Sequence, residues 1–375
     1  MITLSPERWR HHPRVAWAAY VALGVLLAVL PFAVDASMGR TWVRILDFAL
    51  LYVMLALGLN IVVGFAGLLD LGYVAFYAVG AYVYAILASP HFGIHLPFWA
   101  LLPLGASVAC VFGVLLGAPT LRLRGDYLAI VTLGFGEIIR IFLNNLNAPV
   151  NITNGPQGIN LIDPIRVVGH PLNPAVEVLG YTLPGTHAHY YLFLALTLLV
   201  VFVAFRLQDS RIGRAWVAIR EDEVAAVAMG INTRNVKLLA FAMGATFGGV
   251  GGGLFAAFQG FVSPESFTLM ESIMILCMVV LGGMGHIPGV ILGAVLLTAL
   301  PELLRYIGPL QDALLGRVVV DPSDLRMLLF GAGLVLVMLF RPEGLWPSPR
   351  RAGELRPDNL DETRQEQQSV YDASR

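Results

Sequence analysis

Long apolar runs are the feature that most constrains the fold of this chain. A helix needs about 20 residues to cross the ~30 Å hydrocarbon core of a membrane, and only helices or closed barrels satisfy every backbone polar group there. The runs are continuous, unlike the ten-residue alternations of a membrane barrel. The predicted spans are 15–34, 45–63, 72–89, 98–117, 127–143, 189–206, 236–261, 270–285, 288–305 and 326–341. The sequence therefore predicts an all-α polytopic membrane protein with about ten transmembrane helices.

Composition supports a membrane environment and argues against nucleic-acid binding, and the absence of two motifs argues against an ATPase or a metal enzyme. Only 13% of the residues are charged and 57% are hydrophobic, whereas soluble domains carry about 25% charged residues. The net charge of -1 leaves no basic field to attract nucleic acid. The sequence has no phosphate-binding loop of the GxxxxGK[ST] type and no dense cluster of metal ligands. We expect no metal site and no catalytic centre.

The distribution of Lys and Arg predicts the orientation. If the N-terminus lies in the cytoplasm, 17 of the 24 basic residues fall in cytoplasmic segments and only four fall outside. Cytoplasmic loops of membrane proteins are enriched in these residues. Both termini are therefore predicted to be cytoplasmic. The first run, at 20 residues, exceeds the 7–15 residues of a signal-peptide core, so we expect it to be a retained span.

Three polar segments interrupt or follow the transmembrane domain, which is predicted to occupy residues 1–346. The segment 144–188 is predicted to be an external loop, and the segment 207–235 a cytoplasmic loop. The tail 347–375 is polar and charged with few apolar residues, so it is predicted to be a disordered cytoplasmic tail.

Glycine is concentrated in three places. The cluster within 244–253 favours tight helix packing, because small residues allow membrane helices to approach closely. The other two clusters, around 64–72 and 282–289, fall where helices should end. They are consistent with plain turns or with unwound backbone along a substrate path. Gly-broken segments in both halves of the chain also suggest an inverted repeat.

The segment 207–235 carries most of the charge in the middle of the chain. Residues 215–229 favour one amphipathic helix, and Gly230 is a natural residue to end it. Such a helix can be a solvated connection or a docking surface. The candidate residues for such a docking surface are Arg214, Glu223, Ala225, Ala226 and Gly230.

Two groups of polar residues are candidates for contact with a transported solute. Glu137 and Arg140 lie three residues apart on a predicted helix, hence on one face. They form either a structural ion pair or, with Asn144 and Asp70, part of a translocation path. The second group lies in the predicted external loop and is either an ordinary turn or a contact at the outer mouth. Its members are Thr153, Asn154, Gly155, Gln157 and Gly158.

Several stretches in order along residues 45–345 carry a family resemblance. They include Leu57-Gly-Leu-Asn60, Gly64-Phe-Ala-Gly67-Leu-Leu-Asp70-Leu-Gly72, Leu123-Arg-Gly-Asp126, Gly136-Glu137-Ile-Ile-Arg140, Thr153-Asn-Gly155-Pro-Gln-Gly158, Val280-Leu-Gly-Gly-Met-Gly285, Pro301-Glu302-Leu and Arg341-Pro-Glu-Gly-Leu. Together they resemble LivM-type permease subunits of branched-chain amino-acid ABC importers. Related LivH-type, urea and sugar permeases share parts of the pattern. The residues Glu223 to Gly230 resemble the coupling loop of such permeases, with one residue inserted after the Glu.

The resemblance implies a transport subunit without enzymatic activity in a bacterial inner membrane. In that family a second LivH-like permease, two ATP-binding subunits and a periplasmic substrate-binding protein complete the importer, and the ATPases bind ATP and Mg. We expect this chain itself to bind no cofactor. The expected substrates are leucine, isoleucine and valine. The alternatives are a related importer for urea, amides or another small solute, and a stand-alone secondary transporter.

Overall fold

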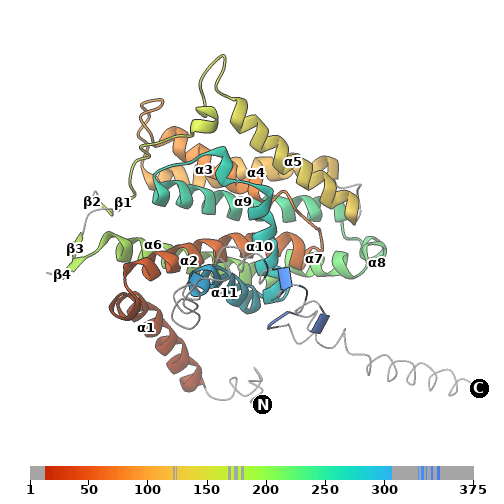
Figure 1. Ribbon diagram of the computed structural model, residues 1–375. Helices are drawn as coiled ribbons and strands as arrows, with labels where there is room; N and C mark the ends of the chain where they lie inside the picture. Colours follow the sequence, from red (N-terminus) through yellow and green to blue (C-terminus); the bar gives the residue numbers. More distant parts are fainter. Residues whose placement is uncertain are drawn as a thin grey trace, which may run out of the picture.

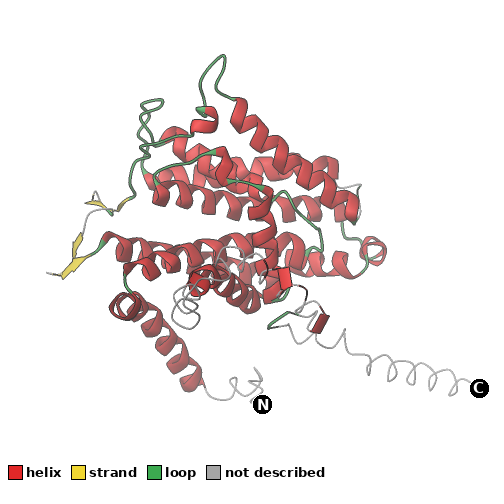
Figure 2. Cartoon of the chain, viewed as in Figure 1, coloured by secondary structure: helices red, strands yellow, loops and turns green. Residues whose placement is uncertain are grey.

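The chain folds as a bundle of long helices (Figures 1 and 2). The computed structural model describes residues 13–120, 123, 125–167, 170–172, 176–178, 181–305, 328, 331–332, 335, 339–340 and 344–346. Within these residues, seven helical segments are long and apolar enough to cross a membrane. The chain is therefore a multi-pass membrane protein, as predicted.

Nine of the ten predicted spans correspond to helices. They are α1 (Pro13–Met38), α2 (Arg40–Asn60), α3 (Val74–Leu87), α4 (Phe98–Thr120), α5 (Asp126–Asn145), α6 (Gly185–Asp209), α9 (Thr233–Gln259), α10 (Leu269–Gly282) and α11 (Ile287–Arg305). α2 continues as the π-helix η2 (Ile61–Phe65). The tenth predicted span, 326–341, and the predicted tail, 347–375, lie largely outside the described residues.

Two layers form the body of the bundle. α3, α4 and α9 pack against one another in one layer, while α2 packs on α6 and α11 in the other and also contacts α9 (Figure 1). α1 is almost entirely exposed, with only 6% of its apolar window buried. Its exposed apolar side chains, including Leu26 and Val29, suit contact with lipid.

The glycine cluster in α9 confirms the predicted close packing. A side chain at Gly252 would collide with the carbonyl oxygen of Tyr77 in α3. A Cβ at Gly249 would lie 2.6 Å from the Cβ of Ala109 in α4. Since no larger residue fits these positions, glycine is what allows α9 to lie between α3 and α4.

The bundle has two distinct ends. At one end, here called the α7–α8 end, two short helices α7 (Arg211–Glu221) and α8 (Glu223–Ala228) connect α6 to α9. At the opposite end, here called the hairpin end, two short antiparallel hairpins lie before α6 (Figure 1). They consist of β1 (Arg166–Val167) with β2 (His170–Pro171), and β3 (Val176–Val178) with β4 (Tyr181–Leu183).

The predicted loop 144–188 is more ordered than expected. Besides the hairpins it contains the 3-10 turn η3 (Gly155–Gln157), and α6 begins at Gly185, four residues before the predicted start. Pro184 immediately before this start has an extended backbone, which suits a residue that precedes a helix. The hairpins depend on cross-strand pairing, which hydropathy does not report.

α3 and α10 are unlike the other spans, because each has 14 residues and begins midway through the bundle. The hydroxyl of Tyr73, just before α3, donates to the carbonyl of Gly244 near the middle of α9, at 3.2 Å. The hydroxyl of Tyr52 donates to Glu271 in the first turn of α10, and Tyr52 lies halfway along the segment Arg40–Phe65. Both short helices therefore start at the middle of the bundle.

The starts of the two short helices meet. The backbone amide of Val74, the first residue of α3, donates to the hydroxyl of Ser272 in α10 at 3.0 Å. A connection precedes each helix: residues 66–73 before α3, and residues 260–268, which contain η4 (Pro264–Ser266), before α10. A long helix, a connection, a short helix and a further span thus occur twice in the same order.

The two glycine clusters around 64–72 and 282–289 were predicted to be either plain turns or unwound backbone, and the structure distinguishes them. Residues 66–73 are a connection that returns into the bundle, whereas Gly283 and Gly285, with φ of 115° and 81°, form a tight turn. That turn ends α10 at Gly282, three residues before the predicted end of the span. One cluster is therefore non-helical backbone within the bundle and the other is a plain turn.

Candidate functional site

The α7–α8 segment contains two helices where one was predicted over 215–229. The hydroxyl of Ser210 accepts from the amide of Gly213 and caps α7. Asp222 has an extended backbone, and its carboxylate accepts from the amides of Val224 and Ala225 at 2.8 and 3.1 Å. Asp222 therefore ends α7 and starts α8, as N-cap residues do. Gly230, with φ of 83°, lies after α8 as predicted.

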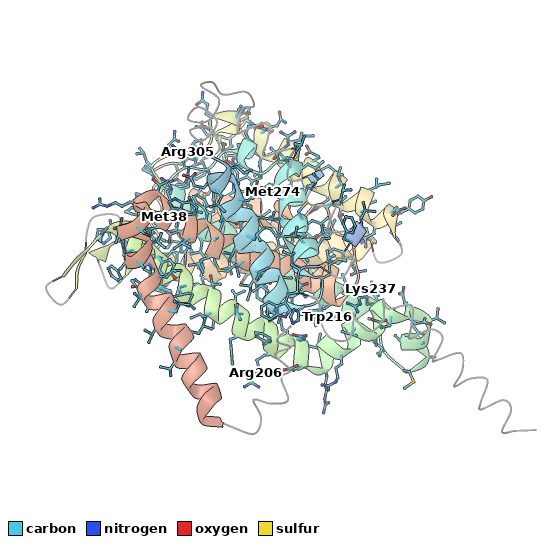
Figure 3. All side chains as sticks on the ribbon, turned by 60° about the horizontal axis from the view of Figure 1, so that its bottom comes forward. Met38, Arg206, Trp216, Lys237, Met274 and Arg305 are labelled. Atoms are coloured by element: carbon cyan, nitrogen blue, oxygen red, sulfur yellow. The ribbon has the colours of Figure 1, made fainter. Side chains whose placement is uncertain are left out.

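Two contacts anchor this segment to α9. The buried indole of Trp216 donates to the carbonyl of Val236 at 2.8 Å. The ammonium of Lys237, only 6% exposed as a residue, lies 2.6 Å from the carboxylate of Glu223. Figure 3 shows Trp216 and Lys237 at the α7–α8 end, away from Met38 at the other end. Movement of α7 and α8 is therefore mechanically linked to α9.

The outer face of α8 is apolar. Val224 and Val227 on α8 are 70% and 55% exposed as residues, and Met229 directly after it is 83% exposed. Ala225 is exposed too, whereas Ala226 faces inward and is buried. Contiguous exposed apolar groups rimmed by polar residues mark surfaces that contact another protein or a membrane. The guanidinium of Arg214, the remaining residue predicted for this surface, donates to the carbonyl of Asp209 at 2.8 Å and steadies the start of α7.

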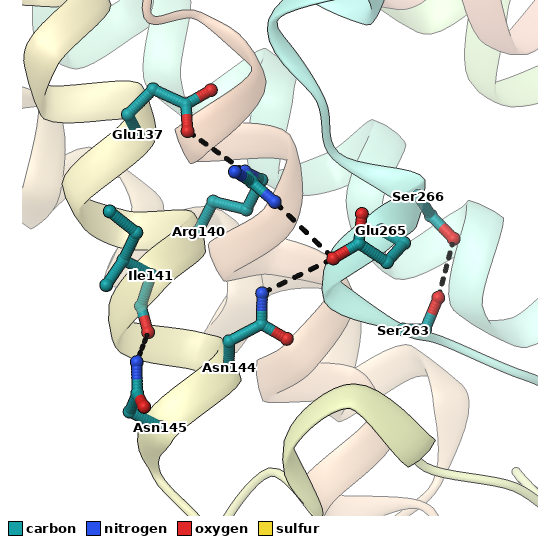
Figure 4. A network of polar contacts seen from close by, with 8 residues as sticks. All are labelled: Glu137, Arg140, Ile141, Asn144, Asn145, Ser263, Glu265 and Ser266. Carbon is teal, nitrogen blue, oxygen red and sulfur yellow. Dashed lines mark hydrogen bonds and ion pairs between the residues drawn. The ribbon is translucent and has the colours of Figure 1, made fainter.

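A second polar site lies on α5. The guanidinium of Arg140 binds Glu137 on its own helix at 3.0 Å and Glu265 of η4 at 3.4 Å. The amide of Asn144 donates to the same Glu265 oxygen at 3.5 Å (Figure 4). The predicted Glu137–Arg140 pair is present on one face, and three of the four predicted path residues are together.

This network is not fully enclosed by the chain. The side chains of Arg140, Glu137 and Glu265 are 27%, 33% and 61% exposed. Charges exposed to lipid are expensive, so charged groups in membrane proteins usually face a cavity or another protein. The network has two carboxylates for one guanidinium, which leaves it able to accept hydrogen bonds from a cation.

Asp70, the fourth predicted path residue, is separate. It is 1% exposed and lies in the connection before α3, where its carboxylate accepts from the amide of Gly72 at 2.9 Å. The adjacent amide of Leu71 donates to the hydroxyl of Thr132 on α5 at 3.0 Å. Asp70 therefore shapes the start of α3 and holds it against α5.

The residues predicted for the outer mouth form a compact turn. Thr153 is buried and donates to the carbonyl of Leu143 at 2.7 Å, and Asn154 donates to the carbonyl of Gly158 at 2.9 Å. Gly155 is buried within η3, whereas Gln157 is exposed. Ile159 pairs with Val262 in an antiparallel bridge. The bridge places this turn beside η4 and hence beside Glu265.

Sequence reasoning missed two functional candidates. Glu265 was overlooked because it lies before an apolar run rather than within one; its position in a Gly- and Pro-bounded connection was the available signal. Arg220 was counted only as a cytoplasmic charge, although it reaches η2 at Gly64 and lies beside Gly67 and Gly285. Among the described residues no group of three metal-ligating side chains comes together.

Comparison with known proteins identifies the family of this chain. A family model described as the permease component of the branched-chain amino acid transport system matches residues 41–338. The chain is 44% identical to the high-affinity branched-chain amino acid transport system permease protein LivM of Escherichia coli K12, over 88% of this chain and 75% of that protein. This chain belongs to the family of branched-chain amino acid transport permeases.

More distant relatives include both permease types. A probable LivM permease of Methanocaldococcus jannaschii is 28% identical over 72% of this chain and 74% of its own length. The permease LivH of Escherichia coli K12 is 28% identical over 80% of this chain and 92% of its own length. No solved structure matches the fold.

Proposed function

We propose that this chain is one permease subunit of an ATP-driven importer that carries leucine, isoleucine and valine across the inner membrane. ATP hydrolysis takes place on two partner ATPases, and the chain itself binds no ATP or Mg. A LivH-like permease completes the membrane unit, and a periplasmic binding protein delivers the substrate. The family match and the LivM and LivH relatives support this proposal.

The observation that carries the proposal is the exposed apolar face of α8. Val224, Val227 and Met229 lie on or directly after α8, and the Glu223–Lys237 and Trp216–Val236 contacts join the α7–α8 segment to α9. A docking helix for an ATPase needs these two properties, an outer face that binds and an inner face that transmits movement. All three residues are more than half exposed, which leaves this face free for a partner.

The proposal assigns the α7–α8 end to the cytoplasm and the hairpin end to the periplasm. The arginines of α7 and the basic residues around it agree with this orientation. The transmembrane domain then comprises residues 1–346, with the coupling loop at 207–235 and the external segment at 144–188. Both termini lie on the cytoplasmic side.

We assign the α5–η4 network to the translocation path. An amino acid carries an ammonium group. The network holds two carboxylates, Glu137 and Glu265, for the one guanidinium of Arg140, so it offers the ammonium acceptors. The turn Thr153–Gly158 lies next to η4 through the Ile159–Val262 bridge, so it forms the outer approach. Asp70 supports the path by holding α3 in place.

The experiment is uptake in proteoliposomes. The chain is reconstituted with its partner permease, both ATPases and the binding protein, and labelled leucine, urea and ribose are compared with and without ATP. ATP-dependent leucine uptake is expected. Uptake of urea or ribose would discard the amino-acid assignment, and uptake driven by an ion gradient without ATPases would identify a secondary transporter.

A variant pair tests the docking surface. We expect Met229→Glu combined with Val227→Glu to abolish co-purification of the ATPases, because charges replace apolar contacts that bury on binding. The control is Val150→Glu, an equally exposed apolar site at the hairpin end. Retention of the ATPases by the α8 variant would contradict the assignment.

A further inference from the structure

Arg220, on α7, reaches from the proposed docking segment into the bundle. Its guanidinium donates to the carbonyl of Gly64, in the π-helix η2, at 2.8 Å. A second guanidinium nitrogen lies 2.8 Å from the carboxylate of Glu221. The side chain is 23% exposed, so most of it is enclosed by its neighbours. A charged side chain from the α7–α8 segment is therefore bound to the end of α2.

The chain leaves room for this arginine at two glycines. A Cβ at Gly67 would lie 2.5 Å from the Cγ of Arg220, and one at Gly285 would lie 3.2 Å from its Nη1. Gly67 and Gly285 have φ of 68° and 81°, a backbone conformation that favours glycine. The Arg220 side chain thus lies between the connection before α3 and the turn after α10.

A further contact joins these two segments directly. The amide of Gly285 donates to the side-chain oxygen of Asn60 at 2.8 Å. Gly64 is also in this contact, since a Cβ there would lie 2.5 Å from the Gly285 nitrogen. Asn60, Gly64, Gly67, Gly285 and Arg220 form one cluster, here called the arginine cluster. It connects segments more than 200 residues apart in the sequence.

The arginine cluster lies beside the segments that flank the two short helices. η2 is followed by the connection 66–73 and then α3, while the turn at Gly283–Gly285 directly ends α10. Single π-helical turns within α-helices occur frequently at functional sites. Arg220 therefore lies beside the backbone that leads into α3 and the backbone that ends α10. The starts of these two helices meet at the middle of the bundle.

We propose that Arg220 is the positioning residue that transmits movement of α7 and α8 to α3 and α10. The inference rests on the proposed function, because it assumes that the ATPases move the α7–α8 segment. When α7 shifts, the guanidinium pulls on the Gly64 carbonyl and on the packed turn at Gly285 together. The short helices then separate or close at their meeting point. Packed elements of this kind switch between discrete arrangements rather than deform continuously.

The test measures uptake of labelled leucine and hydrolysis of ATP in the same reconstituted complex. Arg220→Gln removes the charge and the guanidinium fork but leaves α8 and its exposed face intact. We expect leucine taken up per ATP hydrolysed to fall about tenfold, within the usual range of coupling effects between sites. ATP hydrolysis and the amount of bound ATPase remain as in the unaltered complex. A merely structural role would lower the amount of complex and both activities together.

Two further variants complete the test. Arg220→Lys retains the charge and one donor to Gly64, so an intermediate ratio of uptake to hydrolysis is expected. Arg305→Gln serves as the control, because it is the same change at an arginine whose side chain is 73% exposed and pairs with Glu302 on its own helix, α11. If Arg220→Gln does not accumulate, the ratio of uptake to hydrolysis in Arg220→Lys tests the inference instead. Wild-type coupling in every Arg220 variant that assembles overturns the inference, and absence of ATP-dependent uptake in the unaltered complex overturns the proposed function and the inference together.

Discussion

The two short helices have the same length and a similar start, but they differ in their surroundings. α3 buries 11 of its 14 residues, between α4 and α9. α10 buries seven of its 14, and the connection before it carries the exposed Glu265. The difference indicates that α3 is held as part of the core, whereas α10 and its connection have one face toward the polar network. The same helix pattern thus serves packing in one half and, in our proposal, transport in the other.

The largest expected effect is a loss of stability on truncation of a side chain in α3. Phe76 on α3 is fully buried, whereas Met270 on α10 is 58% exposed. Phe76→Ala is expected to lower the free energy of unfolding by about 3–5 kcal/mol, because it removes a buried ring and leaves a cavity. Met270→Ala should change it by less than about 1 kcal/mol. Unfolding by denaturant in detergent measures both, and equal losses would show that the two helices are equally embedded.

An intermediate effect is expected where the helices meet. Ser272→Ala removes the hydroxyl that accepts from the Val74 amide. Leaving this amide without a partner should cost about 1–3 kcal/mol of unfolding free energy. Ser107→Ala is the control, because Ser107 is exposed and its hydroxyl donates to the carbonyl of Pro103 on the same helix, α4. A cost at Ser272 no greater than at Ser107 would contradict a structural role for the junction.

The smallest effect on stability is expected at Glu265. Exposed ion pairs contribute about 0–1 kcal/mol, so Glu265→Gln should leave the unfolding free energy nearly unchanged. Leucine uptake is nevertheless expected to fall, because the α5–η4 network loses an acceptor for the substrate ammonium. Glu302→Gln on α11, whose carboxylate also contacts an arginine, is the matched control for uptake. Undiminished uptake by the Glu265 variant would remove η4 from the path.

Much of the fold was predictable because it depends on local composition. Each apolar run long enough to span a membrane forms a helix wherever the structure describes it, since no other unclosed backbone is satisfied in lipid. Gly230 was predicted to end the helix over 215–229, and it does follow α8 with a positive φ, which favours glycine. The break at Asp222 was missed, since the choice between one helix and two depends on its side chain capping α8.

Part of the candidate site was predictable in the same way. Glu137 and Arg140 face each other because residues three apart share a helix face, and their spacing alone showed this. The addition of Glu265, 125 residues further along, followed no local rule. Asp70 was grouped with the path residues although it lay near a predicted helix end, and its burial against α5 gives it a supporting position.

The sequence alone determined that this chain is a polytopic helical membrane protein, and its motifs indicated the permease family. Hydropathy, glycine and charge act over a few turns of helix, so they can be read along the chain. Tertiary structure decided which connections meet: the start of α3 with that of α10, and Arg220 with Gly64 and Gly285. These contacts join residues far apart in sequence, and they form only when the helices pack closely enough for backbone and side chain to touch.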